Sequence, residues 1–327
     1  MALTAEHLIS VPGLLSRWVR LPNGVKSHYV TSGEDGPAVI LIHGGIAGSS
    51  GTAGFRHMAP FLGARGFRVY CPDLPGFGLT TGPIEEYEPG FSGIVDYLHD
   101  FASALCLDRF FIGGNSMGCS ASLMYMVAHP ERVKGAALIA GNIGDHLHWQ
   151  EMAAVDPRTP EEKPPAVPFD GSEDSMRRLM STIILDADQI TDDLVAMRTH
   201  AANLHKDAYA RVMGGVGAEY RGTLDANVKA RLRMRGRLED LTIPTVYVYG
   251  REDVVLAVEA GYAQEDLLPN FQFFYPEKTG HQAQTDSPEL INQLFLEFFR
   301  DGRVSRATAA AAGVSGRRPP LPNLVEA

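Results

Sequence analysis

The stretch of sequence that decides the fold of this chain is Gly114-Asn115-Ser116-Met117-Gly118. An apolar run precedes it and a helix-forming run follows it. A G-x-S-x-G pattern at a strand-to-helix junction is typical of a tight turn that exposes a serine nucleophile. The glycines are needed because a Cβ two residues before or after the serine would crowd the turn. The sequence therefore predicts a nucleophilic Ser116 at the start of a helix, where the backbone N–H of Met117 would stabilise an oxyanion.

Short apolar runs on either side of this turn predict the strands of a sheet. They lie at residues 28–31, 38–43, 68–72, 110–113, 135–140, 245–249 and 271–275. The run at 38–42 is apolar at every position, which suits a central strand buried on both faces. Helical stretches separate most of the runs, and this alternation indicates a mostly parallel sheet with helices on both faces.

An aspartate and a histidine follow Ser116 in an informative order. Asp253 comes just after the run at 245–249, and His281 comes shortly after the run at 271–275. A histidine can take the serine proton near neutral pH, and a carboxylate fixes its tautomer and orientation. The chain order Ser, Asp, His is that of the α/β-hydrolase fold, so these three residues are the predicted catalytic triad. Glu252 is the competing acid, and we expect it to point elsewhere.

A second glycine-rich loop, His43-Gly44-Gly45-Ile46, closes the apolar run at 38–42. Two adjacent glycines let the backbone come close to a substrate. In this fold the loop supplies the second N–H of the oxyanion hole, here that of Ile46. A plain strand-to-loop turn is the alternative interpretation. His43 itself is expected to orient or pack rather than to catalyse.

The middle of the chain predicts a helical insertion. The rhythm of strands stops after residue 140, and residues 157–168 hold five prolines, which predicts an irregular loop. Residues 176–185 and 193–213 then read as helical, with Thr191 as an N-cap. We therefore divide the chain into core residues 1–143, a helical lid at 144–238, core residues 239–300, and a flexible C-terminal tail at 301–327 with few anchors.

Composition excludes several classes of function. The chain has 327 residues and a formal net charge of −10, which argues against nucleic acid as a partner. No apolar run is long enough to cross a membrane, and no signal peptide is visible, so a cytoplasmic protein is expected. His146-x-His148 lacks a third ligand, and no phosphate-binding glycine motif is present, so neither a metal nor a cofactor is predicted.

Within the α/β-hydrolases, the chain resembles the meta-cleavage product hydrolases. These enzymes hydrolyse a carbon–carbon bond in vinylogous 1,5-diketones formed by aromatic ring fission. The likeness is carried by Asn115 before the serine and by lid residues around 191–195 and Arg198. The resemblance implies that Arg198 engages the substrate carboxylate, that Gly44, Gly45 and Asn115 contribute to substrate binding, and that the protein forms a homodimer or a larger oligomer. An arginine on the helix surface remains the alternative for Arg198.

The chain departs from that family at two places in the substrate pocket. The family's first loop usually contains a proline, and here Ala47 stands in its place. The family usually has a tryptophan after the histidine, and here that position is Gln282, which we assign to substrate binding.

The resulting prediction is a serine-dependent hydrolase that acts on a small molecule. Its leading substrate class is the 2-hydroxy-6-oxo-dienoates of aromatic degradation. A carboxylesterase or lactonase with the same triad is the alternative. A ligand receptor that keeps hydrolase residues is the third possibility.

Overall fold

The computed structural model describes residues 3–143, 150–151, 154–159, 161–163, 165, 167–223, 226–231 and 233–326. The strands are β1 Leu15–Arg20, β2 Lys26–Ser32, β3 Ala38–Ile42, β4 Arg68–Pro72, β5 Phe110–Asn115, β6 Val133–Ile139, β7 Thr245–Val248 and β8 Gln272–Phe274. The helices are α1 Gly51–Phe55, α2 Met58–Gly63, α3 Phe91–Ala104, α4 Met117–Ala128, α6 Glu173–Met180, α7 Asp192–Leu204, α8 Lys206–Tyr220, α9 Ala226–Arg231, α10 Val258–Leu267, α11 Ala283–Asp286, α12 Pro288–Asp301 and α13 Arg306–Ala311. Short 3-10 helices lie at Ile84–Glu86, Pro130–Arg132 and Ala187–Gln189.

The strands form one sheet in the order β1-β2-β4-β3-β5-β6-β7-β8. From β4 to β8 all neighbouring strands are parallel, whereas β2 runs antiparallel to both β1 and β4. Each of the predicted runs is a strand, so the expectation of a mostly parallel sheet is confirmed. β1 was not predicted, because its residues are exposed or half-buried and carry no apolar run.

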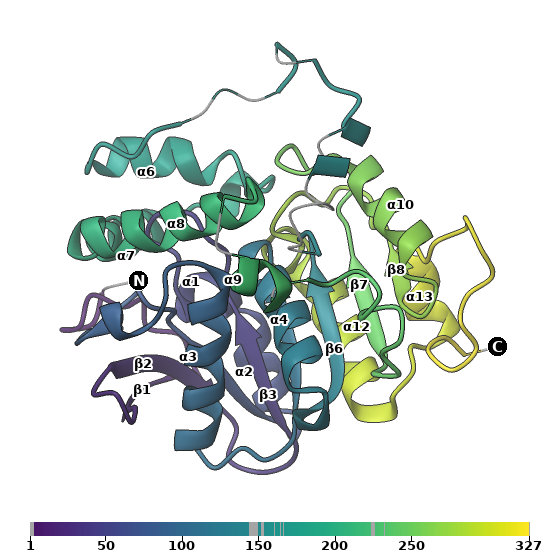
Figure 1. The fold of residues 1–327 in the computed structure, drawn as a ribbon, viewed down its shortest axis with the longest axis horizontal. Coiled ribbons are helices and arrows are strands. Elements are labelled where there is room, and N and C mark those ends of the chain that lie inside the picture. Colours follow the sequence, from purple (N-terminus) through teal and green to yellow (C-terminus); the bar gives the residue numbers. More distant parts are fainter. Residues whose placement is uncertain are drawn as a thin grey trace.

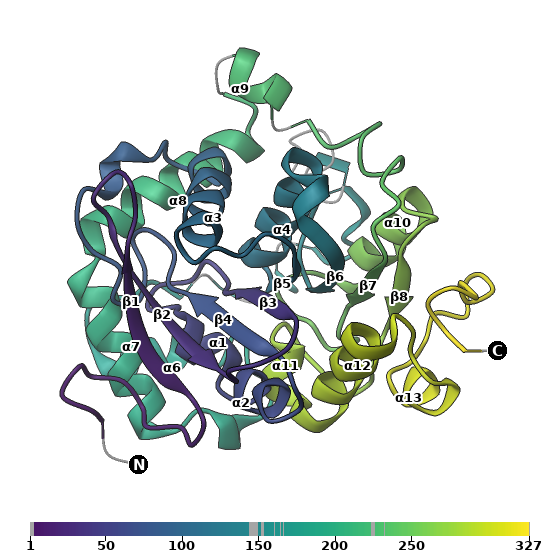
Figure 2. The same ribbon diagram turned by 90° about the horizontal axis from the view of Figure 1, so that it is seen from below.

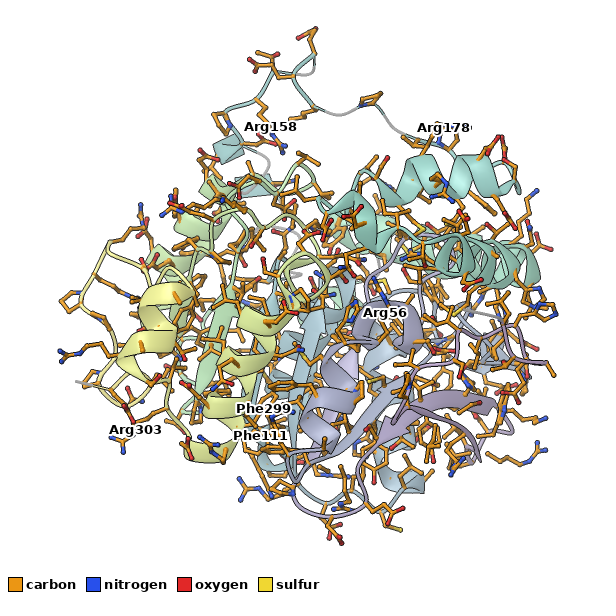
Figure 3. The ribbon with its side chains drawn as sticks, turned by 180° about the vertical axis from the view of Figure 1, so that it is seen from behind. Arg56, Phe111, Arg158, Arg178, Phe299 and Arg303 are labelled. Atoms are coloured by element: carbon orange, nitrogen blue, oxygen red, sulfur yellow. The ribbon has the colours of Figure 1, made fainter. Side chains whose placement is uncertain are left out.

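Helices cover both faces of the sheet (Figures 1 and 2). Side chains of β3 alternate between the faces: Ile40 and Ile42 pack in the cluster that contains α3 and α4, and Leu41 packs in the cluster that contains α2 and α12. Figure 3 shows Phe111 of β5 beside Phe299 of α12, with ring centroids 4.9 Å apart. The alternation explains why the run at 38–42 is apolar throughout.

Between β6 and β7 the described part of the predicted lid is helical from α6 to α9 with short breaks, whereas its described residues from 156 to 172 form no helix, as the prolines predict. Figure 1 shows α6, α7 and α8 stacked above one end of the sheet. The hydroxyl oxygen of Thr191 accepts a hydrogen bond from the backbone N–H of Leu194 at 3.3 Å, which is the expected cap of α7. The long helical run ends at His205, so α7 and α8 are separate helices. No helix among the described residues is both long and apolar enough to cross a membrane.

The prediction of few anchors in residues 301–327 is wrong. Leu324 is fully buried, Val325 is nearly so, and Val325 forms a parallel bridge with Val304. Ser315 donates a hydrogen bond to the buried carboxylate of Glu265 at 2.9 Å. The Ala- and Arg-rich composition concealed these buried apolar residues, which are well separated along the segment. The C-terminal residues are part of the core.

Candidate active site

The turn between β5 and α4 holds Ser116 in an unusual backbone conformation. Its φ is +58° and its ψ is −120°, a region that residues with a side chain rarely occupy. A Cβ on Gly118 would lie 2.0 Å from the carbonyl oxygen of Ile42, and one on Gly114 would lie 2.3 Å from that of Gly118. The two glycines therefore allow the close approach that the turn requires.

His281 and Asp253 are joined directly. Nδ1 of His281 lies 2.8 Å from Oδ2 of Asp253, and both side chains are buried. The other carboxylate oxygen of Asp253 accepts hydrogen bonds from the backbone N–H groups of Val255 and Leu256 at 2.8 and 2.9 Å. Neighbouring Glu252 instead accepts from the backbone N–H of Thr279, 3.0 Å away. The geometry assigns Asp253, and not Glu252, to the histidine.

Two contacts bring the loop of His281 to the rest of the site. A Cβ on Gly250 would lie 2.2 Å from the carbonyl oxygen of Thr279, so the loops after β7 and β8 touch through their backbones. The side-chain amide of Asn115 donates a hydrogen bond to the carbonyl oxygen of His281 at 2.8 Å. Asn115 thus fixes the His281 backbone and does not line the cavity, unlike the substrate-binding role expected of it.

Ser116 and His281 open into one cavity of about 220 Å³. Its described lining residues are Gly45, Ile46, Ser116, Met117, Ser120, Gly141, Asn142, Ile183, Met213, Val216, Tyr220, Val255, Leu256 and His281. None of these is Lys, Arg, Asp or Glu. The wall comes from both the core and the helices above it, and it is mainly apolar.

The loop after β3 passes close to the serine turn. Ile46 and Gly45 line the cavity, and a Cβ on Gly45 would lie 2.8 Å from the sulfur of Met117. Gly44 lies behind them, and its Cβ would sit at an ordinary 3.4 Å from that of Ser116. The two predicted oxyanion donors, Ile46 and Met117, therefore border the same space as Ser116.

His43 has a packing role in this loop. Burial lowers its pKa, so the ring is neutral. Its Nε2 accepts a hydrogen bond from the backbone N–H of Leu74 at 3.1 Å, and its Nδ1 donates to the carbonyl oxygen of Gly44 at 2.7 Å. Both ring nitrogens are occupied, as expected of an orienting residue.

Arg198 is buried, with 1 % of its surface exposed, so the alternative of a helix-surface arginine is wrong. Its Nη2 lies 3.4 Å from the carbonyl oxygen of Ala47 and 3.3 Å from the hydroxyl of Ser49, just beyond the Ile46 loop. Its Nε is buried and has no hydrogen-bond partner. Burial, together with the charge of Arg56, lowers the pKa of Arg198 to about 9. The side chain adjoins the loop but is not among the lining residues of the cavity.

A second buried arginine, Arg56, was not predicted. Its guanidinium donates to the carbonyl oxygen of Ala53 at 2.9 Å and to that of Gln189 at 3.2 Å. Figure 3 shows it between the core and the helices above. Burial lowers the pKa of Arg56 to about 10. Within the described residues, neither arginine forms an ion pair with a carboxylate, so the region carries uncompensated positive charge.

Gln282 is not among the lining residues of the cavity, unlike the substrate-binding role expected of it. Its backbone N–H donates to the carbonyl oxygen of Ile183 at 3.1 Å, and its side-chain oxygen accepts from the hydroxyl of Thr285 at 3.3 Å. It therefore links the His281 loop to the predicted lid through its backbone. Its position after the histidine gave no indication of this role.

Asp286 is a further residue that the sequence did not reveal. One carboxylate oxygen accepts from the backbone N–H of Leu185 at 2.8 Å, and the other accepts from that of Gly280 at 2.9 Å. Burial raises the pKa of Asp286. The side chain joins the loop of His281 to the predicted lid across about a hundred residues of sequence, which no local pattern reports.

The predicted absence of a metal was judged partly on His146 and His148, which lie outside the described residues. Among the residues that are described, no three His, Cys, Asp or Glu side chains are grouped so that they could hold a metal ion.

Known proteins resemble the chain over most of its length. The family model described as "alpha/beta hydrolase fold" matches residues 37–288. A 2-hydroxy-6-oxo-6-(2'-aminophenyl)hexa-2,4-dienoic acid hydrolase of Metapseudomonas resinovorans is 29% identical over 290 residues, covering 88% of this chain and 92% of the relative. A 2-hydroxy-6-oxononadienedioate/2-hydroxy-6-oxononatrienedioate hydrolase of Cupriavidus pinatubonensis is 26% identical over 292 residues, covering 86% and 94%. The solved structure of a serine hydrolase involved in carbazole degradation has a TM-score of 0.70 at 27% identity, covering 88% of this chain and 98% of that one.

Proposed function

Because this chain belongs to the α/β-hydrolase fold family, we propose that Ser116, His281 and Asp253 are its catalytic triad and that it hydrolyses a carbon–carbon bond of a 2-hydroxy-6-oxo-dienoate. The names of the two relatives support this substrate class. The helices between β6 and β7, which border the cavity through Met213 and Val216, act as the lid.

The triad supplies the base and the oxyanion site. His281 accepts the proton of the attacking hydroxyl through Nε2, because its Nδ1 is held by Asp253. Asp253 keeps both its oxygens bonded, so it orients the ring and stabilises the imidazolium that forms. The N–H groups of Ile46 and Met117 stabilise the developing oxyanion, each by about 3 kcal/mol.

The proposed reaction consumes one water molecule. The proton of the 2-hydroxyl group moves to C5 and gives the keto tautomer. An oxygen nucleophile, from water or Ser116, adds to the C6 carbonyl and passes its proton to His281. The C5–C6 bond then breaks, and its electron pair forms a dienolate that takes the proton back from His281 to give the dienol of the five-carbon product. C6 leaves as a carboxylic acid, after hydrolysis if Ser116 attacked.

The observation that carries the proposal is the buried Arg198. A guanidinium without an acidic partner is costly to bury, and a dienoate carboxylate would satisfy it bidentately. Its neighbour Arg56 adds to the positive potential. Arg198 contacts residues 47 and 49, just after Ile46, so the carboxylate end of the substrate would lie there and the distal end would lie in the apolar cavity.

The test is a stopped-flow absorbance assay with 6-phenyl and 6-alkyl 2-hydroxy-6-oxo-dienoates, p-nitrophenyl acetate and a simple lactone. We expect fast loss of the dienoate absorbance, reduced at least about 1,000-fold in Ser116→Ala. Ser181→Ala, at an exposed serine of the lid, is the matched control and should behave as wild type. Dienoates that stay unchanged while esters are cleaved would refute the carbon–carbon assignment.

An esterase or lactonase is the second candidate. It is favoured by the lack of any Lys or Arg among the described residues of the cavity wall. Turnover of the neutral ester or lactone far above that of every dienoate would establish it, and Arg198 would then be a structural residue that packs the loop at 47–49.

A further inference from the structure

We propose that Asn142 is a specificity-determining residue that accepts a hydrogen bond from an N–H or O–H group on the distal substituent of the substrate. The preferred substituent is then an aromatic ring that carries an amino or hydroxyl group. This inference rests on the proposed function and names the substrate class for the same site.

The cavity wall beyond Ser116 suits an uncharged ring. Its apolar residues include Met213 and Val216 of α8, Ile183 of the predicted lid, and Val255 and Leu256 from the loop after β7. Because the described lining residues carry no Lys or Arg, a carboxylate on the distal substituent would be desolvated without a partner. The wall therefore disfavours substrates with a second acidic group.

One corner of this apolar wall is polar. The hydroxyl of Ser120 donates a hydrogen bond to the carbonyl oxygen of Asn142 at 2.6 Å, and the hydroxyl of Tyr220 interacts with that same serine. The preceding carbonyl, that of Gly141, accepts from the hydroxyl of Tyr249 at 2.9 Å and from the side-chain amide of Gln264 at 3.0 Å. Hydrogen bonds to the carbonyl oxygens of Gly141 and Asn142 thus fix the backbone at Asn142, so the position of its Cα and Cβ is well defined.

The side chain of Asn142 has an unused acceptor. The residue lines the cavity and is 4 % exposed, yet its Oδ1 is buried without a hydrogen-bond partner. Among the buried side-chain oxygens of the described lining residues, it is the one left in this state, since Ser120 and Tyr220 have partners. A buried unsatisfied acceptor is unfavourable, and the amide torsion is soft, so the oxygen can turn to a donor in the cavity.

The experiment compares matched substituents. Rates are measured for dienoates with 6-phenyl, 6-(2'-aminophenyl) and 6-(3'-aminophenyl) groups, and for the two corresponding methylphenyl compounds, which have similar size but no donor. In wild type, we expect kcat/KM for one amino compound to exceed that of its methyl partner by about three- to tenfold. The ratio should fall to about one in Asn142→Leu and be retained in Asn142→Asp, which keeps an acceptor. Val216→Ala changes the wall but not the polar corner, so it should keep the ratio.

The outcomes separate this inference from the proposed function. If no dienoate is cleaved, the proposed function itself fails. If 6-phenyl dienoate is cleaved but each amino-to-methyl ratio is near one in wild type, or survives in Asn142→Leu, the role of Asn142 is refuted and the function stands.

The melting temperature of Asn142→Leu without substrate provides a second measurement. It should not fall, because the variant removes an unsatisfied acceptor. A drop of several degrees would mean that the amide is bonded within the protein.

Discussion

Arg198 combines two properties that a single substitution can separate. Its charge is buried without an acidic partner, so it costs stability, and it lies where the carboxylate of the proposed substrate would bind. We expect Arg198→Met to lower kcat/KM for dienoates at least about 100-fold, since a charged hydrogen-bonded pair is lost. The kcat/KM for neutral esters should fall far less. The melting temperature of Arg198→Met should equal or exceed that of wild type.

Steady-state kinetics on both substrate types and thermal unfolding provide these numbers. Arg178→Met, at the exposed arginine of α6 labelled in Figure 3, is the control. Equal losses for dienoates and esters would exclude Arg198 as a carboxylate ligand.

Asp73 should govern stability in acid. This buried carboxylate accepts hydrogen bonds from the backbone N–H groups of Gly51 at 2.7 Å and Leu79 at 2.8 Å, and it lies 2.6 Å from Nδ1 of His28. Burial alone would raise its pKa, but His28 and the backbone donor outweigh burial, and the pKa of Asp73 is lowered. A lowered native pKa stabilises the fold above the unfolded value, about 4, and this contribution is lost as pH falls through the native pKa.

We therefore expect Asp73→Asn to have a lower free energy of unfolding than wild type at pH 7. The difference between the two should become smaller below about pH 4. Urea unfolding across pH 2.5 to 7 measures this difference in unfolding free energy, with Asp35→Asn at an exposed site as the control. A gap that is constant with pH would contradict this role for the ionised carboxylate.

At the scale of the element, the side chain of Glu219 connects α8 to the start of α3. The carboxylate of Glu219 accepts hydrogen bonds from the backbone N–H groups of Phe91 at 2.7 Å and Ser92 at 3.3 Å, where α3 has no side-chain cap of its own. Burial raises the pKa of Glu219 to about 7. Between its ordinary value, 4.5, and that value, the native state holds a proton that the unfolded state has released.

The contribution of Glu219 to the unfolding free energy of wild type should therefore decrease as pH rises from about 4.5 to 7. Glu219→Gln should not show that decrease. We expect the melting temperature of Glu219→Gln to improve relative to wild type between pH 5 and pH 8. Glu86→Gln, at an exposed position, should show no such trend. Parallel curves for wild type and Glu219→Gln would mean that the carboxyl does not titrate in this range.

The elements that the sequence predicted are those with local signals. The strand at 38–42 and the helix start at Thr191 can each be predicted from a few neighbouring residues. β1 could not be found in this way, because it is an edge strand whose pairing with β2 alone orders it. The break at His205 was also missed, since the helix formers continue across it and packing alone separates α7 from α8.

For the whole molecule, the C-terminal segment is a structural part of the core. Besides Leu324 and Val325, it brings Arg317 and Arg318 to within 3.5 Å of the buried carboxylate of Glu265. We expect Leu324→Ala to cost about 2 to 5 kcal/mol of unfolding free energy. Deletion of residues 304–327 should cost more, because it also leaves a buried charge unpaired.

Chemical denaturation of both variants tests this expectation. Arg303→Ala is the matched control, since Figure 3 shows Arg303 at the surface. A deletion variant that unfolds at the wild-type denaturant concentration would show that the segment contributes nothing to the core.

The candidate site was predictable where its residues follow strands in a known order. Ser116, Asp253 and His281 lie just beyond β5, β7 and β8, so a parallel sheet brings them to one edge. Asn142 and Asp286 were not predictable, because their roles depend on which atoms find partners in the folded chain. Hydrogen-bond partners of this kind can be identified only in the folded structure.

The conformation of Ser116 has a consequence for how the protein would evolve. Holding a serine at φ +58° and ψ −120° costs of order 1–3 kcal/mol, and a glycine would occupy the same angles without that strain. A library randomised at position 116 and selected only for thermal resistance should therefore enrich glycine over the native residue. The same library selected for turnover should return serine. With Ser116 as the proposed nucleophile, selection for stability and selection for activity would therefore favour different residues at position 116.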